Sequence, residues 1–240
     1  MTTFSHVLDR LLRSEPGRPL VTFYDCAPGA TGERTELSVT TYANWVAKSA
    51  SLLADELDLE RGQSLLIDLP PHWLGPVFLG AAWTLGLRVT ESDDPDAVVC
   101  GPDALPRWQD RAGDLTVLAS ALHPLATRFT EPLPPGVVDL GVEVWSQPDA
   151  FIAIDPPTGD DAATDDLTQA EMWDAAAARS PLRDGDRVLC EANPASPSGL
   201  SSFTEPLVRA GSLVLVSHAD PERLEAVYAD ERATARFPWS

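Results

Sequence analysis

Short apolar runs alternate with amphipathic stretches along most of this 240-residue chain. Residues 64–69 are apolar almost in succession, which is typical of a parallel strand buried on both faces. Residues 72–85 then place Trp73, Val77 and Ala81 at helical spacing, and Gly86 follows in the position of a left-handed cap. Strands that alternate with helices predict an α/β fold, in which one or more largely parallel sheets are flanked by helices.

The remaining elements follow from the same patterns. Helices are predicted at residues 4–12, from a cap at Thr41 to residue 57, near Leu105, and at residues 167–179, 201–210 and 221–230. Further strands are predicted at residues 20–24 and 37–39, joined by a turn at 28–32, and at residues 87–90, 97–100, 116–119, 187–191, 213–217 and 233–237.

Two stretches bear on domain organisation. Residues 122–148 are interrupted by prolines, which predicts a loop-rich connection or short strands, and the alternation at residues 151–154 favours one more strand. We therefore expect a first α/β subdomain over residues 1–150, including the proline-rich connection. A second α/β segment over residues 151–240 is expected to pack on it.

Charge and cysteine usage limit the classes of partner. Acidic residues outnumber basic ones by 37 to 17, which gives a formal net charge of -20. Such a field repels phosphate backbones and anionic lipid headgroups, so we expect neither nucleic acid nor a membrane surface as a partner.

The chain has no apolar run of bilayer length, and residues 1–13 do not have the pattern of a signal peptide. Cys26, Cys100 and Cys190 lie far apart and fit buried thiols in a reducing, cytoplasmic compartment.

Several motifs occur in a familiar order. Thr41-Tyr42 opens a helix, residues 61–64 (Arg-Gly-Gln-Ser) precede an apolar strand, and residues 70–72 (Pro-Pro-His) lead into a helix that ends in Leu85-Gly86. This order resembles the start of the adenylate-forming superfamily, which includes acyl-CoA synthetases and AMP-binding adenylation domains. Residues 183–189, 211–216 and 220–224 are similar to the segment after that family's phosphate loop. The resemblance covers nearly the whole chain and implies a fold like the N-terminal subdomains of these enzymes.

The resemblance also implies where a phosphate loop should stand, directly upstream of residues 167–169 (Leu-Thr-Gln). The family's loop is rich in Ser, Thr and Gly and contains a Lys. Residues 155–166 instead contain five aspartates, two prolines and no cation. A phosphate loop holds anionic oxygens with converging backbone N–H groups and a Lys. We therefore expect this vestigial loop to disfavour ATP; its representative residues are Asp155, Thr158, Gly159, Asp160 and Asp161.

The family's later motifs for adenine and ribose, and its C-terminal domain with the adenylation Lys, do not occur before Ser240. Lys48 is the only lysine of the chain. By the resemblance it lies on the first helices, where we expect it on the solvated surface. We therefore expect no catalytic residue, no adenylation activity and no cofactor.

Other chemistry has weaker support. The aspartates of residues 155–166 could bind a divalent cation, but their spacing matches no EF-hand. A solvated acidic loop with Asp165 and Asp166 at a helix N-terminus is favoured over a metal site. Residues 196–199 (Ser-Pro-Ser-Gly) stand where a nucleophile elbow would, with His218 and Asp220 as conceivable partners, yet the Gly-x-Ser-x-Gly pattern is absent and a turn is favoured.

Isolated histidines and the tryptophans complete the search for functional residues. Surface or capping roles are predicted for His6, His72 and His123. Core or interface positions are predicted for Trp45, Trp73, Trp83 and Trp173.

Two hypotheses follow. The first is a non-catalytic AMP-binding-like protein that acts through protein contacts, as a homodimer or with another protein. The second is a binder of an acyl group, CoA or a nucleotide, or a weak enzyme, which reuses the crevice at the carboxyl ends of the strands. We favour the first.

Overall fold

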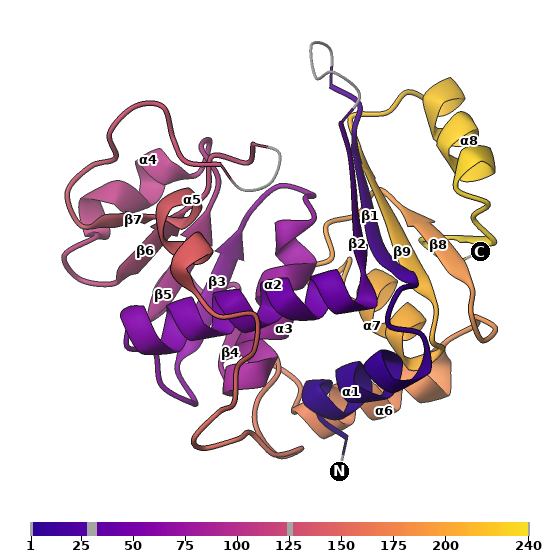
Figure 1. Cartoon of the computed structure of the whole chain (residues 1–240), viewed down its shortest axis with the longest axis horizontal. Helices are drawn as coiled ribbons and strands as arrows, with labels where there is room; N and C mark the ends of the chain where they lie inside the picture. Colours follow the sequence, from indigo (N-terminus) through magenta and orange to yellow (C-terminus); the bar gives the residue numbers. More distant parts are fainter. Residues whose placement is uncertain (1, 28–32, 124–126, 240) are drawn as a thin grey trace.

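The computed structural model describes residues 2–27, 33–123 and 127–239, which form two five-stranded sheets (Figure 1). The first, called the mixed sheet, has the strand order β10-β8-β9-β1-β2. Its strands are β1 (Pro19–Asp25), β2 (Glu33–Ser38), β8 (Arg187–Cys190), β9 (Ser212–Ser217) and β10 (Ala235–Arg236). Neighbours are parallel except β1 and β2, which pair antiparallel. These strands come from both sides of residue 150, so the sheets do not follow the predicted subdomain boundary.

The second sheet, called the parallel sheet, has the order β4-β3-β5-β6-β7, and all of its pairs are parallel. Its strands are β3 (Ser64–Asp68), β4 (Arg88–Thr90), β5 (Ala97–Cys100), β6 (Thr116–Ala119) and β7 (Val137–Asp139). All four residues of β5 are buried, as expected for a strand that is covered on both faces. The predicted α/β class with largely parallel sheets is confirmed.

Helices cover the sheets and separate them. The longer helices are α1 (Phe4–Ser14), α2 (Val39–Ser51), α3 (Leu74–Leu85), α6 (Gln169–Arg179), α7 (Ser201–Val208) and α8 (Pro221–Asp230). The short ones are the π-helical η1 (Leu52–Glu56), α4 (Leu105–Trp108), η2 (Gln109–Arg111), α5 (Leu140–Glu143) and η4 (Val144–Ser146). In Figure 1, α2 and α3 lie between the two sheets, and α8 lies on the far side of the mixed sheet. Among the described residues, no helix has the length and apolar character needed to cross a bilayer.

An aromatic cluster forms the centre of the main core. The side chains of Phe4, Tyr42, Trp83 and Trp173 are buried, and the ring of Phe4 contacts the other three. Gly80 on α3 allows α2 to approach closely, because a Cβ at this position would lie 2.5 Å from the hydroxyl of Tyr42. The four tryptophans that the sequence assigns to core or interface are all buried.

Two local predictions need correction. Helix α2 begins at Val39, and its N-cap is Ser38, whose hydroxyl accepts a hydrogen bond from the N–H of Thr41, the predicted cap. Residues 151–154 form no strand. Thr164 forms a parallel bridge with Val89 of β4 and so occupies the sheet edge that a further strand would need. The predicted turn at residues 28–32 lies outside the described residues, whereas Gly86 has the predicted left-handed conformation, with φ of 73°.

Candidate functional site

Asp161 organises the acidic segment, residues 155–166, which stands where a phosphate loop would be expected. Its carboxylate accepts hydrogen bonds from the guanidinium of Arg61, at 2.6 and 2.7 Å. It also accepts from the backbone N–H and the hydroxyl of Thr158, at 2.6 and 2.9 Å. Asp155 accepts from the same guanidinium at 3.0 Å. A carboxylate of the loop itself thus takes the N–H that a phosphate loop would offer to a bound anion.

The electrostatics of this contact keep Asp161 ionised. Partial burial raises the pKa of Asp161, but the hydrogen bonds from Arg61 and Thr158 outweigh burial and leave the pKa below its usual value. The other predicted loop residues take part in the same closure. The carbonyl of Gly159 accepts from the N–H of Ala170 at 2.9 Å, and the N–H of Asp160 donates to the hydroxyl of Thr158.

The acidic segment crosses the parallel sheet from one end to the other. Arg61 precedes β3, so residues 155–161 lie at the amino end of that strand. Thr164 then pairs in parallel with Val89 of β4, which carries residues 165–167 to the carboxyl end of β4. The predicted loop residues and the crevice at the carboxyl ends of the strands are therefore at opposite ends of the sheet.

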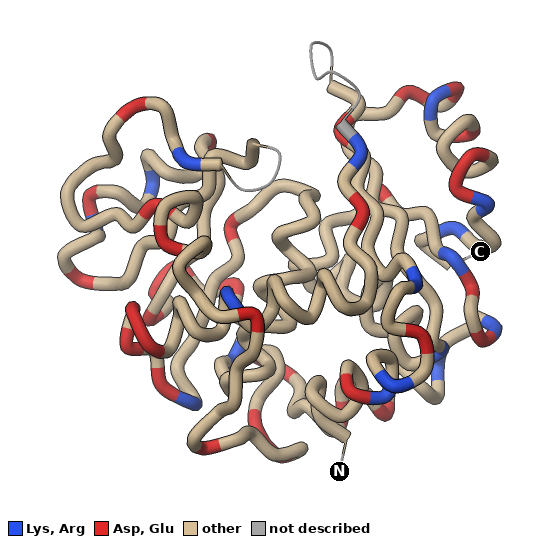
Figure 2. Tube along the Cα trace, viewed as in Figure 1, with Lys and Arg blue, Asp and Glu red and all other residues tan. Residues whose placement is uncertain are grey.

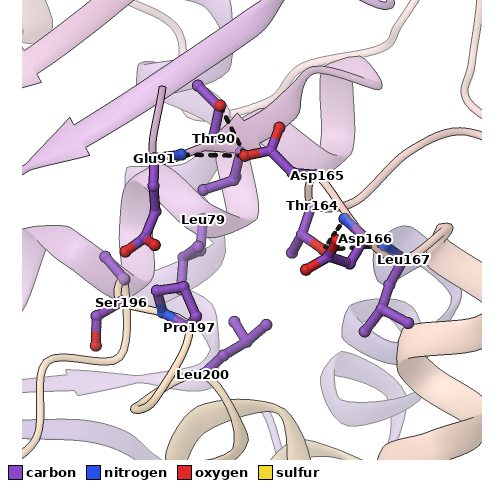
Figure 3. Close-up of a pocket in the computed structure, with 12 residues that line it drawn as sticks. Leu79, Thr90, Glu91, Thr164, Asp165, Asp166, Leu167, Ser196, Pro197 and Leu200 are labelled. Atoms are coloured by element: carbon purple, nitrogen blue, oxygen red, sulfur yellow. Dashed lines mark hydrogen bonds between the residues drawn. The ribbon is translucent and has the colours of Figure 1, made fainter. Parts of the chain in front are cut away.

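At the carboxyl end of β4 lies a cavity of about 290 Å³ (Figure 3). Its walls come from α3, from residues 89–91, from the end of the acidic segment and from the loop between β8 and α7. The lining residues are Leu79, Val89, Thr90, Glu91, Thr164, Asp165, Asp166, Leu167, Ala195, Ser196, Pro197 and Leu200. Open α/β sheets commonly bind ligands at this end, and the volume is at the small end of the usual range.

Carboxylates dominate the polar lining of this cavity. Asp165 accepts from the hydroxyl of Thr90 at 2.8 Å and from the N–H of Glu91 at 3.2 Å (Figure 3). It also pairs with Arg88 at 3.4 Å. No ion pair is found for the carboxylates of Glu91 and Asp166 within the described residues, and no Lys or Arg of this part of the chain lines the cavity. The cavity therefore favours a neutral or cationic group over a phosphate.

Asp165 and Asp166 precede α6, which begins at Gln169. The carboxylate of Asp165 is bound to residues at the end of β4 and does not cap the helix. Helix α6 is capped instead by Thr168, which forms a reciprocal capping box with Glu171.

Sequence comparison decides the family of this chain. It is 35% identical over 237 residues to a Mycobacterium tuberculosis protein described as a "TIGR03089 family protein", and the match covers 95% of each chain. The chain belongs to the TIGR03089 family. No family model matches it.

Solved structures show that this TIGR03089 family chain has the fold of acyl-CoA synthetase N-terminal domains. The N-terminal domain of FACL13 from Mycobacterium tuberculosis superposes with a TM-score of 0.73 at 14% identity, over 98% of this chain and 62% of that one. An acyl-CoA synthetase from Brucella canis superposes with a TM-score of 0.78 at 18% identity, over 98% of this chain and 47% of that one. The family chain therefore spans between about half and three fifths of these proteins. The resemblance to the adenylate-forming fold is confirmed.

The structure does not bring the conceivable hydrolase residues of the TIGR03089 chain together. The hydroxyl of Ser196 donates to the carbonyl of Asn193 at 2.8 Å, as in an ordinary turn. Nδ1 of His218 lies 3.0 Å from the carboxylate of Asp25, and Asp220 caps α8 by accepting from the N–H of Arg223. No hydrogen bond joins the serine to the histidine in the described part of the chain.

The aspartates of residues 155–166 are the candidate ligands for a divalent cation. No group of three His, Cys, Asp or Glu side chains in the described ranges has a geometry that could hold a metal ion.

Lys48 differs from its predicted position on the solvated surface, and His72 takes the second of its two predicted roles, surface or capping. His72 is buried, and its Nδ1 accepts from the N–H of Leu74 at the start of α3, so it does act as a cap. Burial lowers the pKa of His72 to about 4, against an opposing effect of Asp25, so the imidazole is neutral at neutral pH. The ammonium of Lys48 is largely buried and pairs with Asp149 at 3.1 Å. The only lysine therefore has a structural partner.

Sequence reasoning missed a buried charge cluster on the mixed sheet, called here the Glu231 cluster. The carboxylate of Glu231 follows α8 and accepts from the hydroxyl of Tyr24 on β1, from Arg34 on β2 and from Arg187 on β8. Burial raises the pKa of Glu231, but these three donors outweigh it and lower the pKa to about 2. No pattern of neighbouring residues predicts this cluster, because its members lie on β1, on β2, on β8 and directly after α8.

Proposed function

We propose that this chain is a non-catalytic AMP-binding-like protein that acts through contacts with another protein. The acidic segment is the observation that carries the proposal. The N–H of Thr158 is engaged by Asp161, and Arg61 is neutralised by the same carboxylate and by Asp155. A polyphosphate placed here would meet fixed negative charge, and the N–H of Thr158 and the guanidinium of Arg61 are already engaged, which opposes nucleotide binding in the manner of the adenylate-forming fold.

The partner in this proposal is a second copy of the chain or another protein, and the site of action is the cytoplasm. The excess of acidic over basic residues argues against nucleic acid and anionic membranes, and acidic positions are spread over most of the molecule (Figure 2). Cys26, Cys100 and Cys190 are free, which fits a reducing compartment.

A ligand screen with a turnover assay tests the proposal. Thermal unfolding of the full chain is followed with ATP and Mg²⁺, AMP, CoA and acyl-CoA, each in large excess. A ligand at a hundred times its Kd stabilises the folded state by about 2.7 kcal/mol, which a thermal shift resolves. We expect no shift and no pyrophosphate release. Conversion of a carboxylic acid and ATP to an acyl-adenylate would overturn the proposal.

The cavity at the carboxyl end of β4 supports a second candidate function. Leu79, Val89, Leu167 and Leu200 give it apolar walls, and its carboxylates oppose the phosphates of CoA and nucleotides. Of the ligands considered, an apolar acyl group fits these walls best. A fluorescent acyl probe tests this candidate, with Leu200→Trp introduced to fill the cavity. Loss of probe binding in that variant would favour a small-molecule binder over a protein-contact role.

A further inference from the structure

Residues 151–154 (Phe-Ile-Ala-Ile) form an apolar stretch without a partner. The side chain of Ile152 is 90% exposed and that of Ile154 is fully exposed, while Phe151 packs against the main core. Exposure alternates along the four residues, as it does in an extended strand. Side chains of this kind are normally buried, so such a stretch marks a contact surface.

The backbone of this stretch is also unpaired. No backbone or side-chain hydrogen bond reaches the N–H or C=O groups of residues 150–157 from the described residues. Figure 1 shows the stretch as coil in the connection between α5 and α6. Residues 151–153 belong to no helix, turn or strand, and the chain bends at residues 154–155. A segment with free backbone donors and acceptors can pair with a strand that another chain adds.

A groove of about 600 Å³, called here the docking groove, runs beside this stretch. Its apolar lining includes Leu59, Leu85 and Phe151. Its rim carries Asp55 and Glu60, both exposed and without an ion-pair partner in the described chain, together with Asp155.

The nearby cations leave Asp55 and Glu60 of this rim without an ion-pair partner in the described chain, whereas Asp155 is paired with Arg61. Arg61, which also lines the groove, is bound by Asp155 and Asp161. Lys48 is bound by Asp149, just before the stretch. The docking groove thus combines an apolar floor, an open backbone edge and an acidic border.

Charge complementarity indicates which kind of partner the docking groove can bind. A second copy of the chain would bring the same carboxylates and a further net charge of -20 to the interface. Nucleic acid and anionic membranes are repelled by the rim for the same reason. We propose that the docking groove receives an extended segment of a partner protein, in which apolar residues alternate with Lys or Arg. That segment pairs with the backbone of residues 151–153 and places its cations against Asp55 and Glu60; this inference rests on the proposed protein-contact function.

A labelled peptide tests the proposal on the full chain. Fluorescence anisotropy measures the binding of a fluorescein-labelled peptide of alternating Lys and Val, and a peptide of the same composition with the Lys and Val residues in separate blocks is the control. We expect Ile152→Asn with Ile154→Asn to weaken binding by at least about tenfold, because both side chains are buried on pairing. Val142→Asn, at an exposed apolar position on α5 outside the groove, is the matched variant and should leave binding unchanged.

The acidic rim is tested separately from the overall charge. Asp55→Asn with Glu60→Gln should weaken binding by about fivefold and flatten its salt dependence. Asp174→Asn with Glu222→Gln removes the same charge from exposed positions that do not line the groove, and it should weaken binding by less than about twofold. N-methylation of alternate peptide amides should abolish binding if the backbone edge is used.

The outcomes separate this inference from the proposed function. Equal affinity for the alternating and block peptides, or no effect of the Ile152 and Ile154 changes, overturns the docking groove and leaves a protein-contact role to another surface. A dimer in analytical ultracentrifugation that becomes monomeric with Ile152→Asn and Ile154→Asn also overturns it, in favour of a second copy. Turnover or stabilisation by ATP or acyl-CoA overturns the proposed function itself.

Discussion

The Glu231 cluster and the acidic segment both use carboxylates, and they use them in opposite ways. In the cluster a single buried carboxylate faces two arginines and a tyrosine, and it ties the end of α8 to three strands. In the segment, Asp155 and Asp161 share Arg61, Asp165 pairs with Arg88, and Asp160 and Asp166 have no cationic partner among the described residues. The difference teaches that acidic residues hold this fold together only where burial and a cation coincide.

The largest expected effect comes from a substitution in the Glu231 cluster, the more buried of the two regions. Glu231→Gln leaves the guanidinium of Arg187 without its anion, and it should lower the free energy of unfolding by about 3 kcal/mol. Urea denaturation measures the change. Glu225→Gln, on α8 and paired with Arg236 at the surface, is the control and should cost less than about 0.5 kcal/mol. Equal losses in the two variants would show that burial does not distinguish the cluster.

Acid should weaken the cluster in a defined pH window. The pKa of Glu231 is lowered from 4.5 to about 2 in the folded state. Its stabilisation is therefore complete above pH 4.5 and is lost as the pH falls through about 2. Urea midpoints measured across this window should fall more steeply for the unmodified chain than for Glu231→Gln. Parallel pH profiles would contradict the assignment of the acid sensitivity to this carboxylate.

A smaller effect is expected where the acidic segment does have a cation. Asp161→Asn weakens the contacts with Arg61 and Thr158, and it should lower the free energy of unfolding by less than about 1 kcal/mol. Limited proteolysis within residues 155–161 should become faster, because the loop loses its closure. Asp160→Asn is the control at the adjacent position, and it should change neither measurement. If Asp161→Asn destabilised the fold more than Glu231→Gln does, the acidic segment would contribute more to stability than the Glu231 cluster, which would contradict the comparison.

The smallest effect is expected at the cavity. Glu91→Gln with Asp166→Asn removes two carboxylates that have no cationic partner in the described residues, so the free energy of unfolding should change by less than about 0.5 kcal/mol. Urea denaturation again provides the measurement. A loss above about 1 kcal/mol would mean that these carboxylates stabilise the fold, as Glu231 does.

The sequence predicted those elements whose signals are local. The apolar run of β3 and the left-handed glycine cap of α3 at Gly86 lie within a few residues of the structure they form. The prediction of a strand at residues 151–154 is wrong because it also rests on a local signal alone. Their alternation is strand-like, but Thr164 pairs with the edge of the sheet beside β4. The sequence near residues 151–154 cannot show that another segment occupies this edge.

Sequence alone determined the α/β class of the fold, because hydrophobic periodicity is a property of neighbouring residues. The order of the motifs carried the resemblance to adenylate-forming enzymes, and residues 155–166 contain no lysine. Tertiary structure decided which charges are neutralised. Arg61 and Asp161 are 100 residues apart in the chain, and Arg34 and Glu231 are 197 apart, yet each pair is in contact. Whether a carboxylate is buried and paired or exposed and unpaired depends on elements that meet only when both sheets have formed.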